Sequence, residues 1–96
     1  MGNINIEDIK KYKKLERIMK GGANHHRIAI LFLLEKSPGL SVDQISQGRG
    51  IAFVTTASHL QKLNHSGLVN KKYIRRTVAH NLTPYGKNIL TLLRML

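Results

Sequence analysis

Charged side chains of a single sign fill the second half of this sequence. Asp43 is the last acidic residue, because no Asp or Glu occurs from Gln44 to Leu96. The same stretch carries eight cations: Arg49, Lys62, Lys71, Lys72, Arg75, Arg76, Lys87 and Arg94. Cationic groups without acidic neighbours attract a polyanion and displace its counterions. The pattern indicates a nucleic acid first and an acidic membrane surface second, with a merely solvated basic surface as the alternative.

A segment from about Ala52 to His65 has helical spacing and two different faces. Its core-facing side is predicted to hold Phe53, Ala57, Leu60 and Leu63. Its polar side holds the residue types with which a helix in the major groove reads base edges: Thr55, Ser58, His59 and Lys62, with Gln61 at the border. Since this side has neither Arg nor Asn, we expect modest direct readout, with Gln61 as the bidentate candidate. The alternative is that these are ordinary solvent-exposed positions.

After Gly67 the pattern changes to the alternation of two strands with a turn at Arg75–Arg76. Both arginines would then lie at a hairpin tip, where they suit the minor groove of DNA. Lys71 and Lys72 would contact phosphates, as would Arg49 in the predicted turn 48–50. The alternative is that the charges protect the hairpin edges from pairing with other strands.

The chain of 96 residues is expected to form one domain, residues 1–96, which is mainly α with a small β-hairpin. Helix caps, glycine turns and periodicity predict the order α-α-α-α-β-β-α. The expected elements are an N-terminal helix over 5–20, a central helix over 24–36, a helix-turn-helix over 41–66, a hairpin over 68–83 and a last helix over 84–96. The first helix of the helix-turn-helix is expected to span 42–47, and a short strand near Leu40 could join the hairpin.

Three stretches resemble the winged helices of the ArsR type. They are Asn24-x-x-Arg27-x-x-Ile30-Leu31-x-x-Leu34, Ser41-Val42-x-x-Ile45, and Ala57-Ser58-His59-Leu60-x-x-Leu63-x-x-Ser66-Gly67-Leu68-Val69. The end of the hairpin, Leu82-Thr83-Pro84-Tyr85-Gly86, is more similar to the MarR type. The resemblance implies a winged helix-turn-helix and a homodimeric, sequence-specific transcriptional regulator, usually a repressor. Ala57 and Ala52 stand where the ArsR type usually has Ser and a polar cap, which affects base contacts rather than the fold.

The outer helices carry more apolar surface than a small core can cover. The predicted dimer interface comprises Ile9, Tyr12 and Leu15 of the first helix and Tyr85, Ile89, Leu92, Leu93 and Leu96 of the last. A helix that is apolar over so much of its circumference needs a second partner. We therefore expect an intersubunit layer of helices, or alternatively packing of both helices on their own monomer.

Several other classes of protein and site are not expected. The sequence has no Cys, its His residues are poorly placed for one metal site, and no phosphate-binding loop or nucleophile–base pair suggests an enzyme. We therefore predict neither a metal nor another cofactor. No apolar run approaches the roughly 20 residues of a membrane span. The N-terminus lacks the features of a signal peptide, so we expect a cytoplasmic protein.

These observations predict a transcriptional regulator, most simply a repressor, that binds double-stranded DNA as a homodimer. One alternative is a weakly specific architectural DNA-binding protein. Another is a winged helix that binds protein within a larger complex, because a fold does not by itself determine function.

Overall fold

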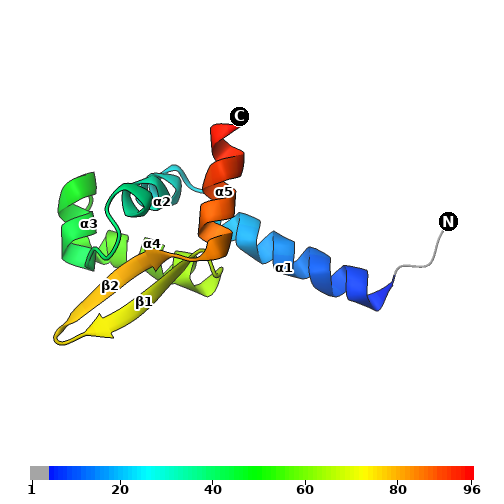
Figure 1. The fold of residues 1–96 in the computed structure, drawn as a ribbon, viewed down its shortest axis with the longest axis horizontal. Helices are drawn as coiled ribbons and strands as arrows, with labels where there is room; N and C mark the ends of the chain where they lie inside the picture. The colour runs from blue at the N-terminus through cyan, green and yellow to red at the C-terminus, as the bar shows by residue number, and fades with distance from the viewer. Residues whose placement is uncertain (1–4) are drawn as a thin grey trace.

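The computed structural model describes residues 5–96, so residues 1–4 of the predicted domain lie outside the described part. The element order is the predicted one (Figure 1). The elements are α1 (Ile6–Gly22), α2 (His25–Lys36), α3 (Val42–Arg49), α4 (Phe53–His65), β1 (Val69–Ile74), β2 (Thr77–Leu82) and α5 (Pro84–Arg94). In Figure 1, α1 projects from the body formed by the other elements, and the β1–β2 hairpin extends in another direction.

Helix α2 lies at the centre of the hydrophobic core. Its residues Ile30, Leu31 and Leu34 are fully buried. The other four helices, β1 and the connection before β1 contribute apolar side chains to the same cluster: Ile18, Ile45, Leu60, Leu63, Leu68, Val69 and Leu90. The nearly continuous apolar run of the sequence is therefore the central helix, as predicted.

Polar caps set where most of the helices begin. Asn24 Oδ1 accepts hydrogen bonds from the backbone N–H groups of His26 and Arg27, at 2.9 and 3.3 Å. Ser41 and Gln44 form a reciprocal capping box at the start of α3. At the starts of α1 and α5, Asn5 Oδ1 accepts from the N–H of Glu7 at 2.8 Å, and Thr83 Oγ1 accepts from the N–H of Gly86 at 3.1 Å. Helix caps were part of the basis for the predicted element order, and these four residues provide them.

Two helices extend through glycines beyond their predicted ends at residues 20 and 47. Helix α1 includes Gly21 and Gly22, and α3 includes Gly48 and Arg49, with Gly50 as its C-cap. At Gly21 the reason is a close approach to the end of α4. A Cβ atom there would lie 2.1 Å from Ser66 Oγ and 2.2 Å from Ser66 Cβ. The absent side chain is what allows the last turn of α1 to pack on Ser66.

The hairpin, or wing, pairs in one antiparallel register from Val69↔Leu82 to Ile74↔Thr77. Arg75 and Arg76 form the two-residue turn, as predicted, and Arg75 has a positive φ of 58°. The expected strand near Leu40 is a single bridge to His80. The backbone N–H of His80 donates to Leu40 O at 2.9 Å, and the N–H of Gly39 donates to His80 O at 3.0 Å. The base of the wing is thereby attached to the loop between α2 and α3.

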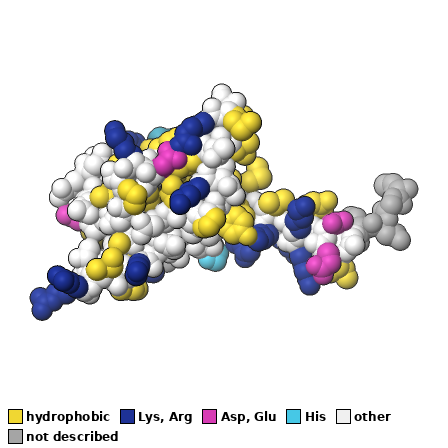
Figure 2. Space-filling model, viewed as in Figure 1, with side chains coloured by type: hydrophobic (Ala, Val, Ile, Leu, Met, Phe, Trp, Pro, Cys, Tyr) yellow, Lys and Arg dark blue, Asp and Glu magenta, His cyan; other side chains and the backbone are white. Residues whose placement is uncertain are grey.

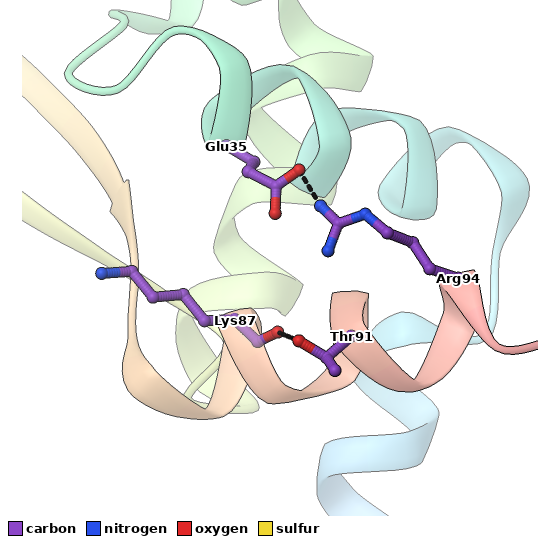
Figure 3. A network of polar contacts seen from close by, with 4 residues as sticks. All are labelled: Glu35, Lys87, Thr91 and Arg94. Carbon is purple, nitrogen blue, oxygen red and sulfur yellow. Dashed lines mark hydrogen bonds and ion pairs between the residues drawn. The ribbon is translucent and has the colours of Figure 1, made fainter.

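Helix α5 is anchored on the body by Leu90, which is fully buried. Its first turn lies close to the end of α4, because a Cβ on Gly86 would be 2.2 Å from Leu68 O. Figure 3 shows Arg94 of α5 and Glu35 of α2 pointing toward each other, and these two side chains form an ion pair. Thr91 Oγ1 donates to Lys87 O within the helix at 3.1 Å. The position of α5 is thus fixed at both of its ends.

Across residues 5–96, none of the helices combines the length and the apolar character that crossing a membrane requires.

Gly21→Ala should destabilise the protein by roughly 1–3 kcal/mol, because the new methyl group overlaps the short, rigid side chain of Ser66. Gly22→Ala is the matched control, since its nearest contact is an ordinary 3.7 Å to Leu68 Cδ1. That control should be neutral or stabilising, because Ala is the better helix former. Urea unfolding of both variants measures the difference.

Adding Ser66→Gly to Gly21→Ala should recover part of the loss, because the overlapping atoms are then removed from the other side. Equal stability of the two single alanine variants would contradict the close contact.

Candidate nucleic-acid interface

Helix α4 presents most of its predicted base-reading residues to solvent. Thr56, Leu60 and Leu63 are buried, and the hydroxyl of Thr56 donates to Ala52 O at 3.0 Å. The opposite side is exposed and includes Thr55, Ser58, Gln61 and Lys62. These four side chains therefore share one accessible face, as expected from their spacing.

Phe53 does not point into the core, contrary to the sequence-based expectation. Its side chain is 54% exposed, whereas Thr56 is fully buried. Phe53 is the first residue of α4, and helical side chains tilt toward the N-terminus of their helix. Its ring therefore reaches past the start of the helix, where the core does not extend.

His59 is the one predicted base-reading residue that is half-buried. Its Nδ1 atom lies 3.5 Å from Arg27 Nη1, and its ring lies 5.5 Å from the ring of His26. Arg27 is itself buried and donates from Nε to Gly21 O at 2.7 Å. His59 thus contacts α2, while its neighbour Ser58 faces outward. A role for His59 at the bases remains a prediction.

Burial and adjacent positive charge act together on the same imidazole. Burial lowers the pKa of His59 first, and the charges of Arg27, His26, Lys62 and His25 lower the pKa further. The His25 and His26 rings are 4.0 Å apart, so three imidazoles and one guanidinium are gathered near the start of α2. This cluster favours the neutral form of His59 in the folded protein.

The wing carries exposed cations along its whole length. Lys71, Lys72, Arg75 and Arg76 are all exposed. Adjacent residues of a strand point to opposite faces, so the side chains of Lys71 and Lys72 lie on opposite faces of the wing. Lys71 lines a groove of about 530 Å³ between the wing and α4, together with Gln61 and His65. The structure thus brings Lys71 beside the accessible face of α4, and Lys72 belongs to the other face of the strand.

Arg75 and Arg76 occupy the far end of the wing, which forms the dark blue tip in Figure 2. Arg49 is exposed at the last position of α3, next to the turn into α4. The predicted backbone-contacting cations are therefore distributed around α4 rather than clustered at one point. Contacts with nucleic acid for each of them remain predictions.

A second basic groove, of about 660 Å³, lies between α1 and α4 and was missed from the sequence. Its charged and polar lining residues are Lys13, Glu16, Arg17, Lys20, Gln61, Lys62, His65 and Ser66. The sequence does contain a signal for it, because Lys13, Arg17 and Lys20 repeat at the spacing of one helix face. That face could be connected to α4 only once the position of α1 was known.

The predicted dimer face is largely uncovered in the single chain. Ile9, Tyr12, Leu15, Tyr85, Leu92 and Leu96 are exposed, whereas Ile89 and Leu93 are half-buried against the core. Figure 2 shows hydrophobic side chains along α5 and along the adjoining side of α1. The two helices are joined by Lys14, whose Nζ donates to Tyr85 Oη at 2.7 Å. Lys14 thus connects α1 to Tyr85, a residue of the predicted dimer face on α5.

Comparison with known proteins gives one family and one fold. The family described as "Bacterial regulatory protein, arsR family" matches residues 24–71. No curated protein sequence matches the chain. Among solved structures, reduced HlyU from Vibrio cholerae N16961 is 30% identical, with a TM-score of 0.79, over 93% of this chain and 94% of its own.

Two further structures have the same architecture. HlyU from Vibrio vulnificus CMCP6, a transcriptional regulator, is 26% identical over 96% of this chain and 97% of its own, with a TM-score of 0.73. The homodimeric winged helix-turn-helix DNA-binding domain Mb0332 from Mycobacterium bovis is 23% identical over 99% of this chain and 85% of that fragment, with a TM-score of 0.82. At that identity the likeness shows the fold alone, which is the winged helix-turn-helix predicted from the sequence.

Stability should depend on pH through His59. Because its folded-state pKa is lowered, the unfolded chain binds more protons as the pH falls below about 6.5. The contribution of His59 is therefore fully present above that pH and is lost as the pH falls toward the folded-state pKa. Thermal unfolding between pH 7.5 and 5 should show a smaller loss of Tm for His59→Gln than for the wild type.

His65→Gln is the control, since His65 is exposed on the same helix. It should keep the wild-type dependence on pH. If His59→Gln follows the wild-type curve throughout, the cluster at the start of α2 does not control the protonation of His59.

Proposed function

We propose that this chain, which belongs to the arsR family of bacterial regulatory proteins, binds double-stranded DNA as a homodimer and regulates transcription. The observation that carries the proposal is the accessible face of α4 beside the basic wing. Ser58, Gln61 and Lys62 are exposed there, and no acidic residue occurs from Gln44 onward. A surface of this composition fits the major groove and its flanking phosphates. Such a role places the chain with the DNA, in the cytoplasm.

The proposed contacts are of two kinds: contacts with base edges and contacts with the DNA backbone. Thr55, Ser58, Gln61 and Lys62 face the base edges, and Gln61 can pair with adenine through two hydrogen bonds. His59 is less accessible, and its contact with Arg27 supports a role in placing α4 rather than a dominant role at the bases. Direct readout by such a set is modest, so DNA shape contributes a larger share of sequence specificity.

The wing and the turn before α4 supply the backbone contacts in this proposal. The tip arginines Arg75 and Arg76 reach the minor groove, where narrow A-tracts concentrate negative potential. Arg49 and Lys71 lie nearer α4 and contact phosphates of the same site, and Lys72 contacts a phosphate from the other face of the wing. Occupying both grooves at a promoter would exclude other proteins, which favours repression as the regulatory outcome.

The dimer is proposed from the uncovered apolar surface of α1 and α5. Tyr12, Leu92 and Leu96 are 59%, 53% and 91% exposed, respectively, which is a large apolar area for a chain of this size. The Mb0332 domain of the same fold is homodimeric, which agrees with this arrangement. A two-fold dimer presents two copies of α4 to half-sites about one helical turn of DNA apart.

DNA affinity should fall steeply as salt increases, with a log–log slope of roughly −4 to −8 for the dimer, because several phosphates per protomer lose their counterions. Fluorescence anisotropy with duplex DNA at a series of salt concentrations measures this slope. Footprinting on genomic fragments then separates a regulator, which protects discrete sites, from an architectural protein, which protects many. A slope near zero would rule out DNA as the partner and favour a protein-binding winged helix.

Leu92→Asp should convert the dimer into a monomer, because a carboxylate buried without a partner is strongly unfavourable. DNA affinity should then fall roughly 10- to 100-fold, since the two half-sites are no longer bound by linked modules. Thr91→Asp is the matched control, because Thr91 is exposed on the same helix and lines a different groove with Lys87. It should remain dimeric.

Sedimentation equilibrium reports the state of each protein, and circular dichroism shows whether Leu92→Asp is folded. A wild-type protein that sediments as a monomer well above micromolar concentration would refute the proposed dimer.

A further inference from the structure

Helix α1 has a basic face that the proposed DNA contacts of α4 and the wing do not use. Lys13, Arg17 and Lys20 follow one another at helical spacings of four and three residues, so they lie on one side of α1. All three are exposed and line the 660 Å³ groove opposite Lys62 and Gln61 of α4. The exposed apolar residues Tyr12, Leu15 and Met19 lie on a different side of the same helix. Helix α1 therefore presents one face for an apolar partner and another of positive charge.

The depth and direction of the groove are set by the contact at its base. Gly21 lies against Ser66, so the last turn of α1 cannot separate from the end of α4 without losing that packing. From there α1 leads away from the body, as Figure 1 shows. Gln61 and Lys62 belong both to the groove and to the accessible face of α4. A DNA duplex that lies on that face therefore borders the groove.

The charge of the groove is strongly positive despite one carboxylate. Glu16 forms an ion pair with Lys20 at 2.7 Å, so these two charges largely compensate each other. Lys13, Arg17 and Lys62 take part in none of the ion pairs found among residues 5–96. His65 also lines the groove. The net charge suits a phosphate-bearing partner.

We propose that the groove between α1 and α4 holds the phosphate backbone of the DNA beside the major groove that α4 reads. This inference rests on the proposed function and adds α1 to the DNA-contacting elements. From Lys13 to Lys20 the helix rises about 10 Å. That distance is comparable to three intervals between successive phosphates of one strand, which are spaced about 3.4 Å apart along the duplex axis. A row of cations along an open groove fits a linear polyanion.

The test neutralises two groove cations and compares them with two others of the same helix. The groove variant is Lys13→Gln with Arg17→Gln, and the control is Lys10→Gln with Lys11→Gln. Lys10 and Lys11 are exposed but do not line the groove, and both variants have the same net charge. Glutamine is uncharged and unbranched and forms helices well, so α1 should be preserved. Circular dichroism and Tm verify this.

The groove variant should bind duplex DNA about 10-fold more weakly than the wild type, and its salt slope should be less steep by about 2 per protomer. The control should keep a slope close to that of the wild type. Hydroxyl-radical footprints should lose protection only at the backbone flanking each half-site, with the preferred sequence unchanged. A variant that exchanges the two cations, Lys13→Arg with Arg17→Lys, should bind DNA like the wild type because both positive charges are kept.

Equal slopes for the groove variant and the wild type would overturn the inference while leaving DNA binding by α4 and the wing intact. An equal loss in the groove variant and the control would also overturn it, because general charge rather than the groove would then be responsible. A wild-type protein without salt-sensitive DNA binding would instead overturn the proposed function, and the inference with it.

Discussion

The arrangement of the outer helices depends on how closely the backbone packs around the end of α4. Gly21 of α1 lies against Ser66, and Gly86 of α5 lies against the carbonyl of Leu68. The hydroxyl of Thr83 also donates to Gly67 O. The connection between α4 and β1, residues 66–68, therefore contacts α1, α5 and the chain that leaves the wing. Because interiors are close-packed, an added methyl group at either glycine would force neighbouring atoms to move. The same short segment therefore determines how α1, α5 and the wing lie relative to the accessible face of α4.

Electrostatics and packing oppose each other in this chain. A formal net charge of +11 on 96 residues disfavours the compact state through self-repulsion. The basic residues are separated by location, with Arg75 and Arg76 at the wing tip and Lys13 and Arg17 on α1. Few carboxylates offset them, and the Glu35–Arg94 pair uses one of these to fasten α5 to α2. A polyanion that binds the basic surfaces would relieve the repulsion and so stabilise the folded chain by mass action.

Local signals explain which parts of the fold could be predicted from the sequence. Asn24, Ser41 and Thr83 cap their helices through hydrogen bonds to residues two or three positions away, so neighbouring sequence contains the whole interaction. The hairpin and its tip follow in the same way from alternation and from the position of Arg75–Arg76.

Tertiary contacts explain the errors. The glycines of α1 looked like a helix end because their partner, Ser66, lies far along the chain. Phe53 has the spacing of a core residue, yet it extends past the start of α4. The half-buried position of His59 against Arg27 of α2 was likewise not foreseen, while its predicted role at the bases stays a prediction. The groove between α1 and α4 was missed for the same reason, since its two walls are distant in sequence. The polar face of α4 itself was predictable because its period lies within one helix.

The predicted dimer face on α1 and α5 has a consequence for how operator occupancy depends on the concentration of the protein. If a second copy covers that face, monomer and dimer are in equilibrium by mass action. When dimers are scarce, the dimer concentration varies with the square of the monomer concentration. Occupancy of an operator with two half-sites would then rise more steeply than in proportion to the total concentration of the protein.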